Sequence, residues 1–295
     1  MYTKTHEAHI LMPTNDLNFK RLFASPKNIN ISKGFLQDLA DYDPLGELKI
    51  TSLKIETPYN FQDVNQLVSE NKHDMLYTEV DYACVDDNGT RFMLEMQKKN
   101  QKYLEQRVAY NVGQKYAQYY ARDTNSDDKY AALQPVIAVV ILEDNHFEDD
   151  IAIRFFRPHD ARHDVYKNNR NLGLEIYIEI NKNAETLPLN LQYWLQYFRT
   201  GRVPECAPEY ITEAMKVSEI SSLSKEEREL ARRMEDAKAR RFSEDAATMD
   251  KGIGQGREER EIEIAKSLLH SGMSVTEVAK HCKISIDILN ELLKL

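Results

Sequence analysis

Acidic and amide side chains stand inside two segments of the chain that otherwise have the pattern of β-strands. Asp81 lies in the first segment, and Glu95 and Gln97 lie in the second, two residues apart, so that they share one face of the predicted strand. The sequence DDNG at residues 86–89 is a strong turn signal, so the two segments are predicted to form a hairpin. Pairing about this turn brings residue 81 opposite roughly residue 94, which places Asp81 and Glu95 close together. Neighbouring carboxylates repel each other unless a cation neutralises them, and such hard oxygen ligands suit Mg²⁺ or Mn²⁺.

The segment that follows, residues 98–122, is basic within an acidic chain. It carries six basic residues and one acidic residue, whereas the whole chain has a formal net charge of −9. Leu104, Val108 and Val112 recur at helical spacing and form a face suited to packing on a sheet. A second face of the same predicted helix holds four polar or aromatic side chains: Tyr103, Arg107, Tyr110 and Gln114. Cations attract phosphates and tyrosines stack on bases, so carboxylates beside this helix suit metal-assisted hydrolysis of a phosphodiester.

The elements expected to position these residues are a mixture of helices and strands. The run PVIAVVIL is continuously apolar and rich in β-branched residues, which is typical of a strand buried on both faces. The mixture predicts an α/β or α+β sheet with helices packed on it. Helices are predicted from a cap at Thr14 or Asn15 through Phe23, and over 31–40, 101–122 and 188–199; strands are predicted over 47–55, both arms of 79–97, 135–142, 151–156 and 173–180.

The C-terminal part of the sequence is charged and helical. Ser224 begins a capping box that predicts a long helix over 225–242, and Ser274 begins another. Helices over 275–282 and 286–293 then form a unit of helix–turn–helix size. Its would-be recognition helix is mostly apolar, whereas base reading needs polar or basic side chains. A DNA reader and a module for docking or homo-oligomerisation therefore both remain open.

The bulk composition excludes several classes of protein. The sequence contains no apolar run of about 18 residues, so no membrane span is predicted. The N-terminus lacks the pattern of a secretory signal. Three widely separated cysteines without a CxxC pair indicate reduced thiols and a cytoplasmic protein. The glycine-rich GIGQG at 252–256 follows no strand and lacks GxGxxG spacing, so no nucleotide cofactor is expected.

An acidic residue on one strand, followed by Glu95-Met96-Gln97 on the next, resembles the core of the PD-(D/E)XK nuclease superfamily. The chain is more closely similar to the Rpn family of recombination-promoting nucleases and putative transposases. Five pieces carry this resemblance in order along nearly the whole chain: Asp16-x-x-Phe19-Lys20, Leu94–Gln97, Arg107-x-x-Tyr110, Pro135–Ile137 and Ala265–Leu269. The resemblance implies a restriction-endonuclease-like mixed sheet flanked by helices, with an all-helical C-terminal extension.

The resemblance also implies roles for individual residues. Asp81, Glu95 and the backbone carbonyl of Met96 would ligate the metal ion. Gln97 stands where the wider superfamily usually has lysine; it can orient a water or a phosphate oxygen, but it carries no charge. Asp16 either adds a further carboxylate or only caps its helix. The residues implied in holding DNA are Lys98, Lys99, Arg107, Tyr110 and Gln114.

These observations predict a Mg²⁺- or Mn²⁺-dependent DNA endonuclease that acts in recombination or mobile-element movement. The predicted divisions are a nuclease-like domain at 1–205, a charged helical connector at 206–260 and a helical unit at 261–295. One alternative is a catalytically inactive DNA-binding or assembly protein that keeps the fold. Another is an interaction scaffold working through residues 224–295. The plainest alternative for the carboxylates themselves is polar decoration of a solvent-exposed hairpin.

Two pairs of histidines offer a rival metal site. His159 and His163 have the spacing of two ligands on one helical turn, but they lack the glutamate of HExxH. Pro158 precedes them in a polar stretch that is typical of a loop. His6 and His9 lie near the N-terminus. Structural or solvated histidines are the favoured interpretation of both pairs.

Overall fold

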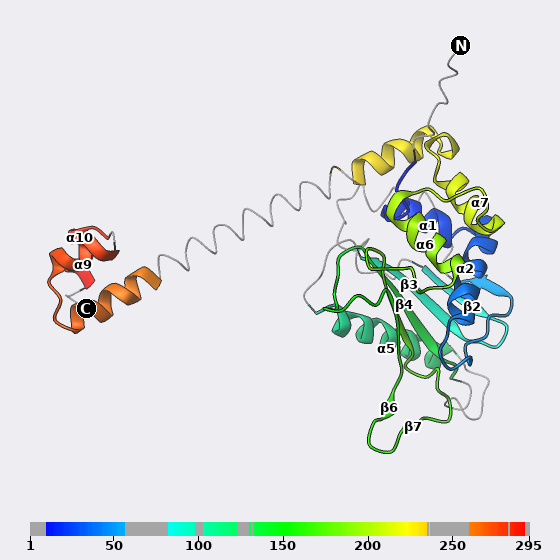
Figure 1. The fold of residues 1–295 in the computed structure, drawn as a ribbon, viewed down its shortest axis with the longest axis horizontal. Coiled ribbons are helices and arrows are strands. Elements are labelled where there is room, and N and C mark those ends of the chain that lie inside the picture. The colour runs from blue at the N-terminus through cyan, green and yellow to red at the C-terminus, as the bar shows by residue number, and fades with distance from the viewer. Residues whose placement is uncertain are drawn as a thin grey trace, which may run out of the picture. The chain divides into compact units, whose positions relative to one another are not determined.

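The larger of two compact parts of the protein contains the main sheet, and the described residues of the smaller part form helices. The computed structural model describes residues 10–56, 82–97, 103–122, 130, 133–234, 236, 260–282 and 284–292. The chain divides into units of residues 1–231 and 232–295, which are described separately. Figure 1 shows the helices and strands of both units.

The sheet of the larger unit is mixed and has six strands. Their order across the sheet is β1-β2-β3-β4-β8-β5, in which β3, β4 and β8 run parallel and the others are antiparallel to their neighbours. The continuously apolar segment forms β4, which is buried along its whole length as predicted. The strands are β1 (Leu53–Ile55), β2 (Tyr82–Asp86), β3 (Arg91–Gln97), β4 (Val136–Leu142), β5 (Ile153–Phe156) and β8 (Glu175–Glu179).

Helices cover the two faces of this sheet unequally. One face packs against four α-helices through a large aromatic and aliphatic core. The other face packs against one long helix, α5, through Leu104 and Val108. The α/β class with helices on a mixed sheet is therefore confirmed. Besides a helix that begins at residue 225, the described helices of this unit are α1 (Asp16–Phe23), η1 (Pro26–Asn28), α2 (Ile29–Asp41), α5 (Leu104–Arg122), α6 (Leu189–Thr200), α7 (Glu209–Ser218) and η2 (Ile220–Ser222).

Local hydrogen bonds explain where the first helix and the central hairpin begin and turn. The Asn15 side chain accepts hydrogen bonds from the amides of Leu17 (3.0 Å) and Asn18 (3.3 Å), so Asn15 is the N-cap of α1. In the hairpin, the Asp86 carboxylate accepts from the amides of Asn88 and Thr90. Gly89 adopts a φ of +80°, which glycine tolerates without steric cost. The predicted helix and turn are both confirmed.

Two of the predicted elements differ from the structure. The strand predicted over 47–55 is wrong for its first part, because only Leu53–Ile55 pair with β2. Asp43 explains the difference, since its carboxylate binds the amides of Glu47 (3.0 Å) and Leu48 (2.9 Å). Those amides are then unavailable to a strand ladder. The loop expected after Pro158 instead contains a small hairpin of β6 (His159–Asp160) and β7 (Val165–Tyr166).

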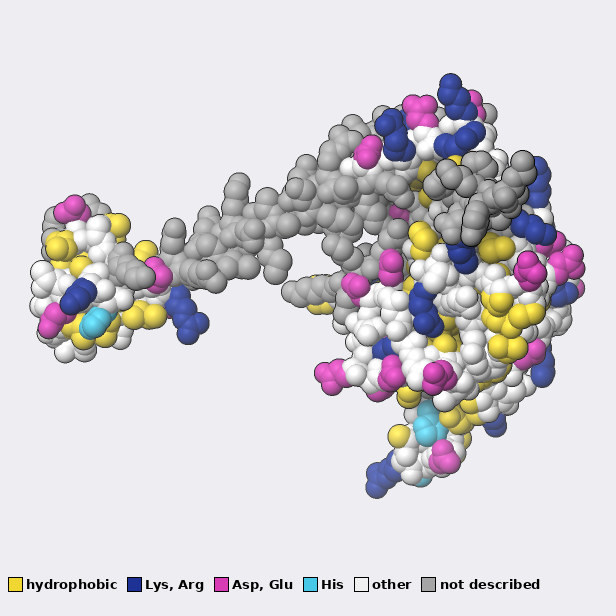
Figure 2. Space-filling view, turned by 45° about the horizontal axis from the view of Figure 1, so that its top comes forward, with side chains coloured by type: hydrophobic (Ala, Val, Ile, Leu, Met, Phe, Trp, Pro, Cys, Tyr) yellow, Lys and Arg dark blue, Asp and Glu magenta, His cyan; other side chains and the backbone are white. Residues whose placement is uncertain are grey.

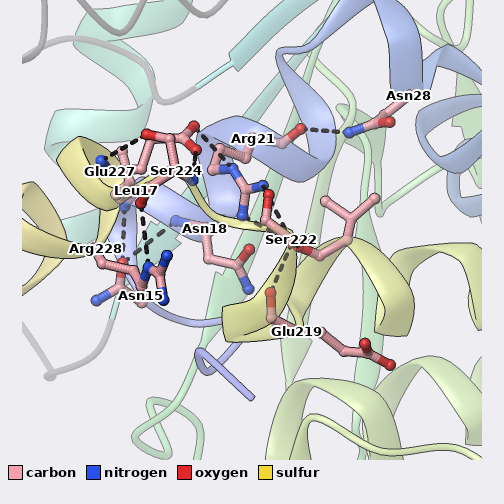
Figure 3. Close-up of polar contacts among 11 residues, drawn as sticks. Asn15, Leu17, Asn18, Arg21, Asn28, Glu219, Ser222, Ser224, Glu227 and Arg228 are labelled. Atoms are coloured by element: carbon pink, nitrogen blue, oxygen red, sulfur yellow. Dashed lines mark hydrogen bonds and ion pairs between the residues drawn. The ribbon is translucent and has the colours of Figure 1, made fainter. Parts of the chain in front are cut away.

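The predicted helix at 225 begins on the surface of α1. Ser224 and Glu227 form the predicted capping box, with reciprocal amide-to-side-chain bonds of 2.9 and 3.1 Å. Arg21 of α1 reaches Glu227 Oε1 at 3.3 Å and donates to the carbonyl of Val217 at 3.1 Å. Figure 3 shows the Arg21 side chain near Glu227 and Ser222. One arginine thus joins α1, the end of α7 and the first turn of the next helix, which is helical over 225–234.

Residues 260–282 and 284–292 of the smaller unit form three helices, and the last two confirm the helices predicted at 275–282 and 286–293. A helix over 260–270 is followed by α9 (Val275–Cys282) and α10 (Ile286–Leu292). Gly272, with a φ of +91°, ends the first helix. The buried centre of this unit, within its described residues, is Ala265, Val278 and Leu289. Throughout the described parts of the chain, no helix combines the length and apolar content needed to cross a membrane.

Candidate active site

Glu95 and Gln97 lie on the central strand β3, on the face of the sheet that α5 covers. Phe92, Leu94 and Met96 belong to the large core of the other face, and Met93 packs on the α5 side. Because side chains alternate along a strand, Glu95 and Gln97 share the α5 face, as predicted. Their exposed fractions are only 6% and 8%. A solvent-exposed decorated hairpin face is therefore the wrong description of these two side chains.

The carboxylate of Glu95 has two donors on one of its oxygens. Gln97 Nε2 donates to Glu95 Oε1 at 2.6 Å, and Arg107 Nη2 donates to the same atom at 3.3 Å. Among the residues that the structure describes, none donates to the second oxygen, Oε2. A buried carboxylate is costly unless it is paired and hydrogen-bonded, and these contacts supply that compensation.

The rotation of α5 about its axis determines which side chains reach the sheet. Leu104 and Val108 are buried against β4 and β8, as the sequence predicts. This packing turns Arg107 toward Glu95 and leaves it one-third exposed. Tyr110 is 64% exposed, and its hydroxyl accepts a hydrogen bond from the Gln114 amide. Along the predicted polar face of α5, Arg107 therefore contacts the Glu95 carboxylate, and Tyr110 and Gln114 lie farther along the helix and are exposed.

The remaining predicted site residues are distributed differently. Asp81, Lys98 and Lys99 lie outside the described residues. The hairpin register Tyr82↔Leu94 is one residue away from the predicted pairing of residues 81 and 94. Asp16 lies in the first turn of α1, which packs on the opposite face of the sheet from Glu95, and the cap of that helix is Asn15.

The backbone carbonyl of Met96 points toward the edge of β3 that faces β2. Residues on either side of it bond to the other edge: Arg91 N donates to Pro135 O, and Glu143 N donates to Gln97 O, both at 2.9 Å. Backbone groups alternate between the two edges of a strand, so the Met96 carbonyl points away from β4. The Met96 side chain is buried in the large core.

Polar residues of β8 on the same face were not predicted as part of the site. Tyr177 Oη donates to Glu175 Oε2 at 3.0 Å. Burial is the main cause that raises the pKa of Glu175, and burial together with Glu175 raises the pKa of Tyr177. The signal was present in the sequence, because Glu175, Tyr177 and Glu179 alternate with isoleucines.

Glu179 fixes the loop that follows β4. Its Oε1 accepts from the amides of His146 (2.6 Å) and Phe147 (3.1 Å), and its Oε2 lies 2.7 Å from Lys182 Nζ. Both members of this ion pair are almost completely buried. The loop in turn places His146 Nε2 3.2 Å from Glu105 Oε1 on α5. This network positions the loop beside α5 and does not itself contact Glu95.

His159 and His163, the rival metal-site pair, each contact a different aspartate. His159 Nε2 lies 2.9 Å from Asp164, and His163 Nδ1 lies 2.7 Å from Asp160. His6 and His9 lie outside the described residues. Within the part of the chain that the structure describes, no group of three or more His, Cys, Asp or Glu side chains could hold a metal ion.

The potential metal-ligand atoms at Glu95 fit a hard divalent cation better than zinc. The carboxylate and the nearby backbone carbonyl offer oxygen atoms, which is the preference of Mg²⁺ and Mn²⁺, while the Gln97 amide presents its nitrogen to Glu95. Acidic and basic side chains are interspersed over the face of the larger unit seen in Figure 2. Attraction for a polyanion would therefore depend on local cations such as Arg107 rather than on the net charge.

The mixed sheet, the buried glutamate of its central strand and the covering helix define the PD-(D/E)XK class of nuclease fold. Residues 13–246 match the model of a protein family described as PD-(D/E)XK nuclease family transposase. The chain belongs to this family, which confirms the resemblance drawn from the sequence. Comparisons with curated proteins and with solved structures found no match.

Proposed function

We propose that this protein is a metal-dependent endonuclease that hydrolyses phosphodiester bonds in DNA. Membership of a nuclease and transposase family supports the reaction class. The observation that carries the proposal is the buried Glu95 carboxylate, which shares a face of the sheet with Gln97 and bonds to Arg107. Burying an acidic residue on a central strand is costly for folding, so its presence there indicates a functional role.

Metal ligation is proposed for Asp81, Glu95 and the backbone carbonyl of Met96. When bound, Mg²⁺ or Mn²⁺ would polarise a phosphate oxygen and lower the pKa of a coordinated water. The second oxygen of Glu95 accepts no bond from the described residues, so it offers a ligand atom. Gln97 would hold the attacking water or a phosphate oxygen through its amide. Asp16 is not included in this set, because α1 packs on the opposite face of the sheet from Glu95.

DNA is the proposed substrate, held along the outer face of α5. Arg107, Tyr110 and Gln114 follow one another along that face, with Tyr110 and Gln114 exposed. The guanidinium suits phosphate, and an exposed tyrosine ring suits a base or sugar. Lys98 and Lys99 are proposed as further phosphate contacts.

The wider setting is proposed from the family and from the smaller unit. We place the activity in DNA recombination or mobile-element movement, in the cytoplasm, where the three free cysteines would stay reduced. We also propose that the C-terminal helices join two copies of the chain, because three isoleucines of this unit are nearly half exposed: Ile264, Ile286 and Ile288. Light scattering of Ile286→Glu beside the wild type tests this; an unchanged mass would count against it.

Plasmid cleavage tests the nuclease proposal directly. The wild type should nick supercoiled plasmid with Mg²⁺ or Mn²⁺, and Glu95→Gln should lower the rate by at least about 10²-fold. Asp87→Asn is the matched control, because it neutralises an exposed carboxylate of the same hairpin. A wild type that binds DNA but cuts none would favour the inactive DNA-binding alternative.

A further inference from the structure

Position 97 raises a question about charge in the proposed active site. A lysine at this position supplies a cation that can stabilise negative charge on a leaving oxygen, and glutamine supplies none. Gln97 is nevertheless nearly buried and bonded directly to Glu95. The site therefore needs its positive charge from another residue.

The side chains of Gln97 and Arg107 both donate hydrogen bonds to the same atom, Glu95 Oε1. Gln97 Nε2 lies 2.6 Å from Glu95 Oε1, and Arg107 Nη2 lies 3.3 Å from that same oxygen. The guanidinium thus occupies the immediate surroundings of the amide at position 97, although it comes from a different element. Among the described residues, Arg107 is the one cation paired with Glu95.

The packing of α5 on the sheet positions Arg107 near Glu95. Leu104 and Val108, on either side of Arg107 in the sequence, are buried against the sheet. Arg107 is therefore held within reach of Glu95 on β3. Its side chain remains one-third exposed, so the guanidinium borders both the buried carboxylate and the outer face of α5.

We propose that Arg107 supplies, from α5, the positive charge that Gln97 lacks, and so acts as a catalytic residue rather than as a distant backbone contact. This inference rests on the proposed nuclease function. In the reaction, the oxygen of a water molecule bonds to phosphorus while that water gives up a proton to solvent, and one ester P–O bond breaks. The leaving oxygen takes its proton from water, because a guanidinium keeps its own protons and only donates hydrogen bonds. Arg107 would stabilise the charge that develops during this exchange.

The same contact has a consequence that does not depend on cleavage. Arg107 is the counter-ion of Glu95 in the structure, so it competes with any divalent cation for that carboxylate. Removing Arg107 should strengthen metal binding while it weakens catalysis. A residue that only holds the DNA backbone would not affect metal affinity in the absence of DNA.

Four variants of the full chain test the inference by cleavage of plasmid under single-turnover conditions. Arg107→Ala should lower the rate by about 10²-fold, as loss of one oxyanion donor does in other enzymes. Adding Gln97→Lys to Arg107→Ala should restore at least about tenfold, because it returns a cation to the same place. Arg107→Lys should be intermediate. Lys115→Ala, the control, removes a charge from the same helix and should leave the rate within about twofold.

Calorimetric titration with Mn²⁺, without DNA, provides the second readout. Arg107→Ala should bind Mn²⁺ several-fold more tightly than the wild type, and Lys115→Ala should not differ. Circular dichroism checks that each variant is folded; if Arg107→Ala is not, Arg107→Lys decides.

Each outcome of these experiments bears on one proposal or on both. If the wild type cuts DNA, Glu95→Gln does not, and Arg107→Ala behaves like Lys115→Ala, this inference is overturned while the nuclease function stands. Failure of Gln97→Lys to rescue Arg107→Ala also overturns it. A wild type without cleavage removes the proposed function and this inference together.

Discussion

Each face of the sheet covers a buried acidic side chain, and the two side chains differ in their hydrogen bonds. On the face covered by α1, α2, α6 and α7, the buried Asp38 receives hydrogen bonds from three side chains: Asn190, Trp194 and Tyr210. On the face covered by α5, the buried Glu95 has its two donors among the described residues on one oxygen. Described side chains donate to both oxygens of Asp38, whereas they donate to only one oxygen of Glu95.

The two faces also differ in the size of their apolar clusters and in their number of carboxylates. The helical face holds an aromatic cluster around Phe23, whose ring centroid lies 4.8–6.5 Å from those of five other aromatic residues. The α5 face has smaller apolar clusters and several buried or half-buried carboxylates. We therefore expect changes on the first face to act on folding and changes near Glu95 to act on activity.

Phe23→Ala should produce the largest change in stability. The side chain is fully buried, so its loss leaves a cavity and should cost about 4 kcal/mol of unfolding free energy. Phe156→Ala on the α5 face should cost about 1 to 2 kcal/mol, because that ring is partly exposed. Urea unfolding followed by circular dichroism measures both. Equal losses would show that the two faces contribute alike to stability.

Lys182→Met should have the next largest effect. It removes the nearer of two cations paired with the buried Glu179, at 2.7 Å, and leaves Arg154 Nε at 3.9 Å; the cost should be about 3 kcal/mol. The double variant Glu179→Gln with Lys182→Met should recover part of this loss, since the poorly compensated buried charge is removed. Lys167→Met, at an exposed position, is the control and should stay within about 0.5 kcal/mol. Urea unfolding would contradict the prediction if the double variant were less stable than Lys182→Met.

Asp38→Asn should have a smaller effect that depends on pH. Burial raises the pKa of Asp38 in the folded protein, against the opposing hydrogen bonds from Asn190, Trp194 and Tyr210. The folded state therefore binds the proton more tightly than the unfolded chain, whose pKa is near 3.8. The stabilising contribution of Asp38 is thus greatest below that value and falls as pH rises through the raised folded pKa.

The comparison of Asp38→Asn with the wild type isolates this contribution, because asparagine does not titrate. The variant should be less stable by about 1 to 2 kcal/mol, with the larger difference at pH 4 than at pH 7. Urea unfolding at the two pH values is the measurement. A difference that grows with pH would mean that hydrogen bonding lowers the pKa of Asp38 instead.

The sequence predicted elements whose pattern is continuous and local. The apolar run of β4, the cap of α1 and both C-terminal capping boxes follow from neighbouring residues alone. The prediction failed where a distant or unusual contact intervened: Asp43 captures the amides that would have lengthened β1. The helix α7 was not predicted, although Ile211 and Ala214 pack in the large core.

The candidate site was predictable only as a set of residues on one face. Alternation along β3 gave the shared face of Glu95 and Gln97, and helical spacing gave the outer face of α5. The contact between Arg107 and Glu95 depends on how α5 is rotated over the sheet, which packing decides. The burial of Glu175 and Glu179 likewise depends on their neighbours across the sheet. The spacing of residues alone carries none of this information.

Tyr110→Ala should give the smallest effect, and it tests the outer part of the α5 face. The ring is 64% exposed, so unfolding should change by less than about 0.5 kcal/mol. If α5 holds DNA, affinity should fall by about 1 to 2 kcal/mol through lost stacking, measured by fluorescence anisotropy with EDTA present to prevent cleavage. Leu189→Ala, an exposed apolar residue that begins α6 on the opposite face, should leave affinity unchanged. Tyr110→Phe then identifies the contact: retained affinity means that the ring stacks, whereas equal loss means that the hydroxyl, which bonds to Gln114, is needed. If neither tyrosine variant alters binding, DNA does not lie along this face of α5, and the chemistry of this side of the sheet is confined to Glu95 and its immediate partners.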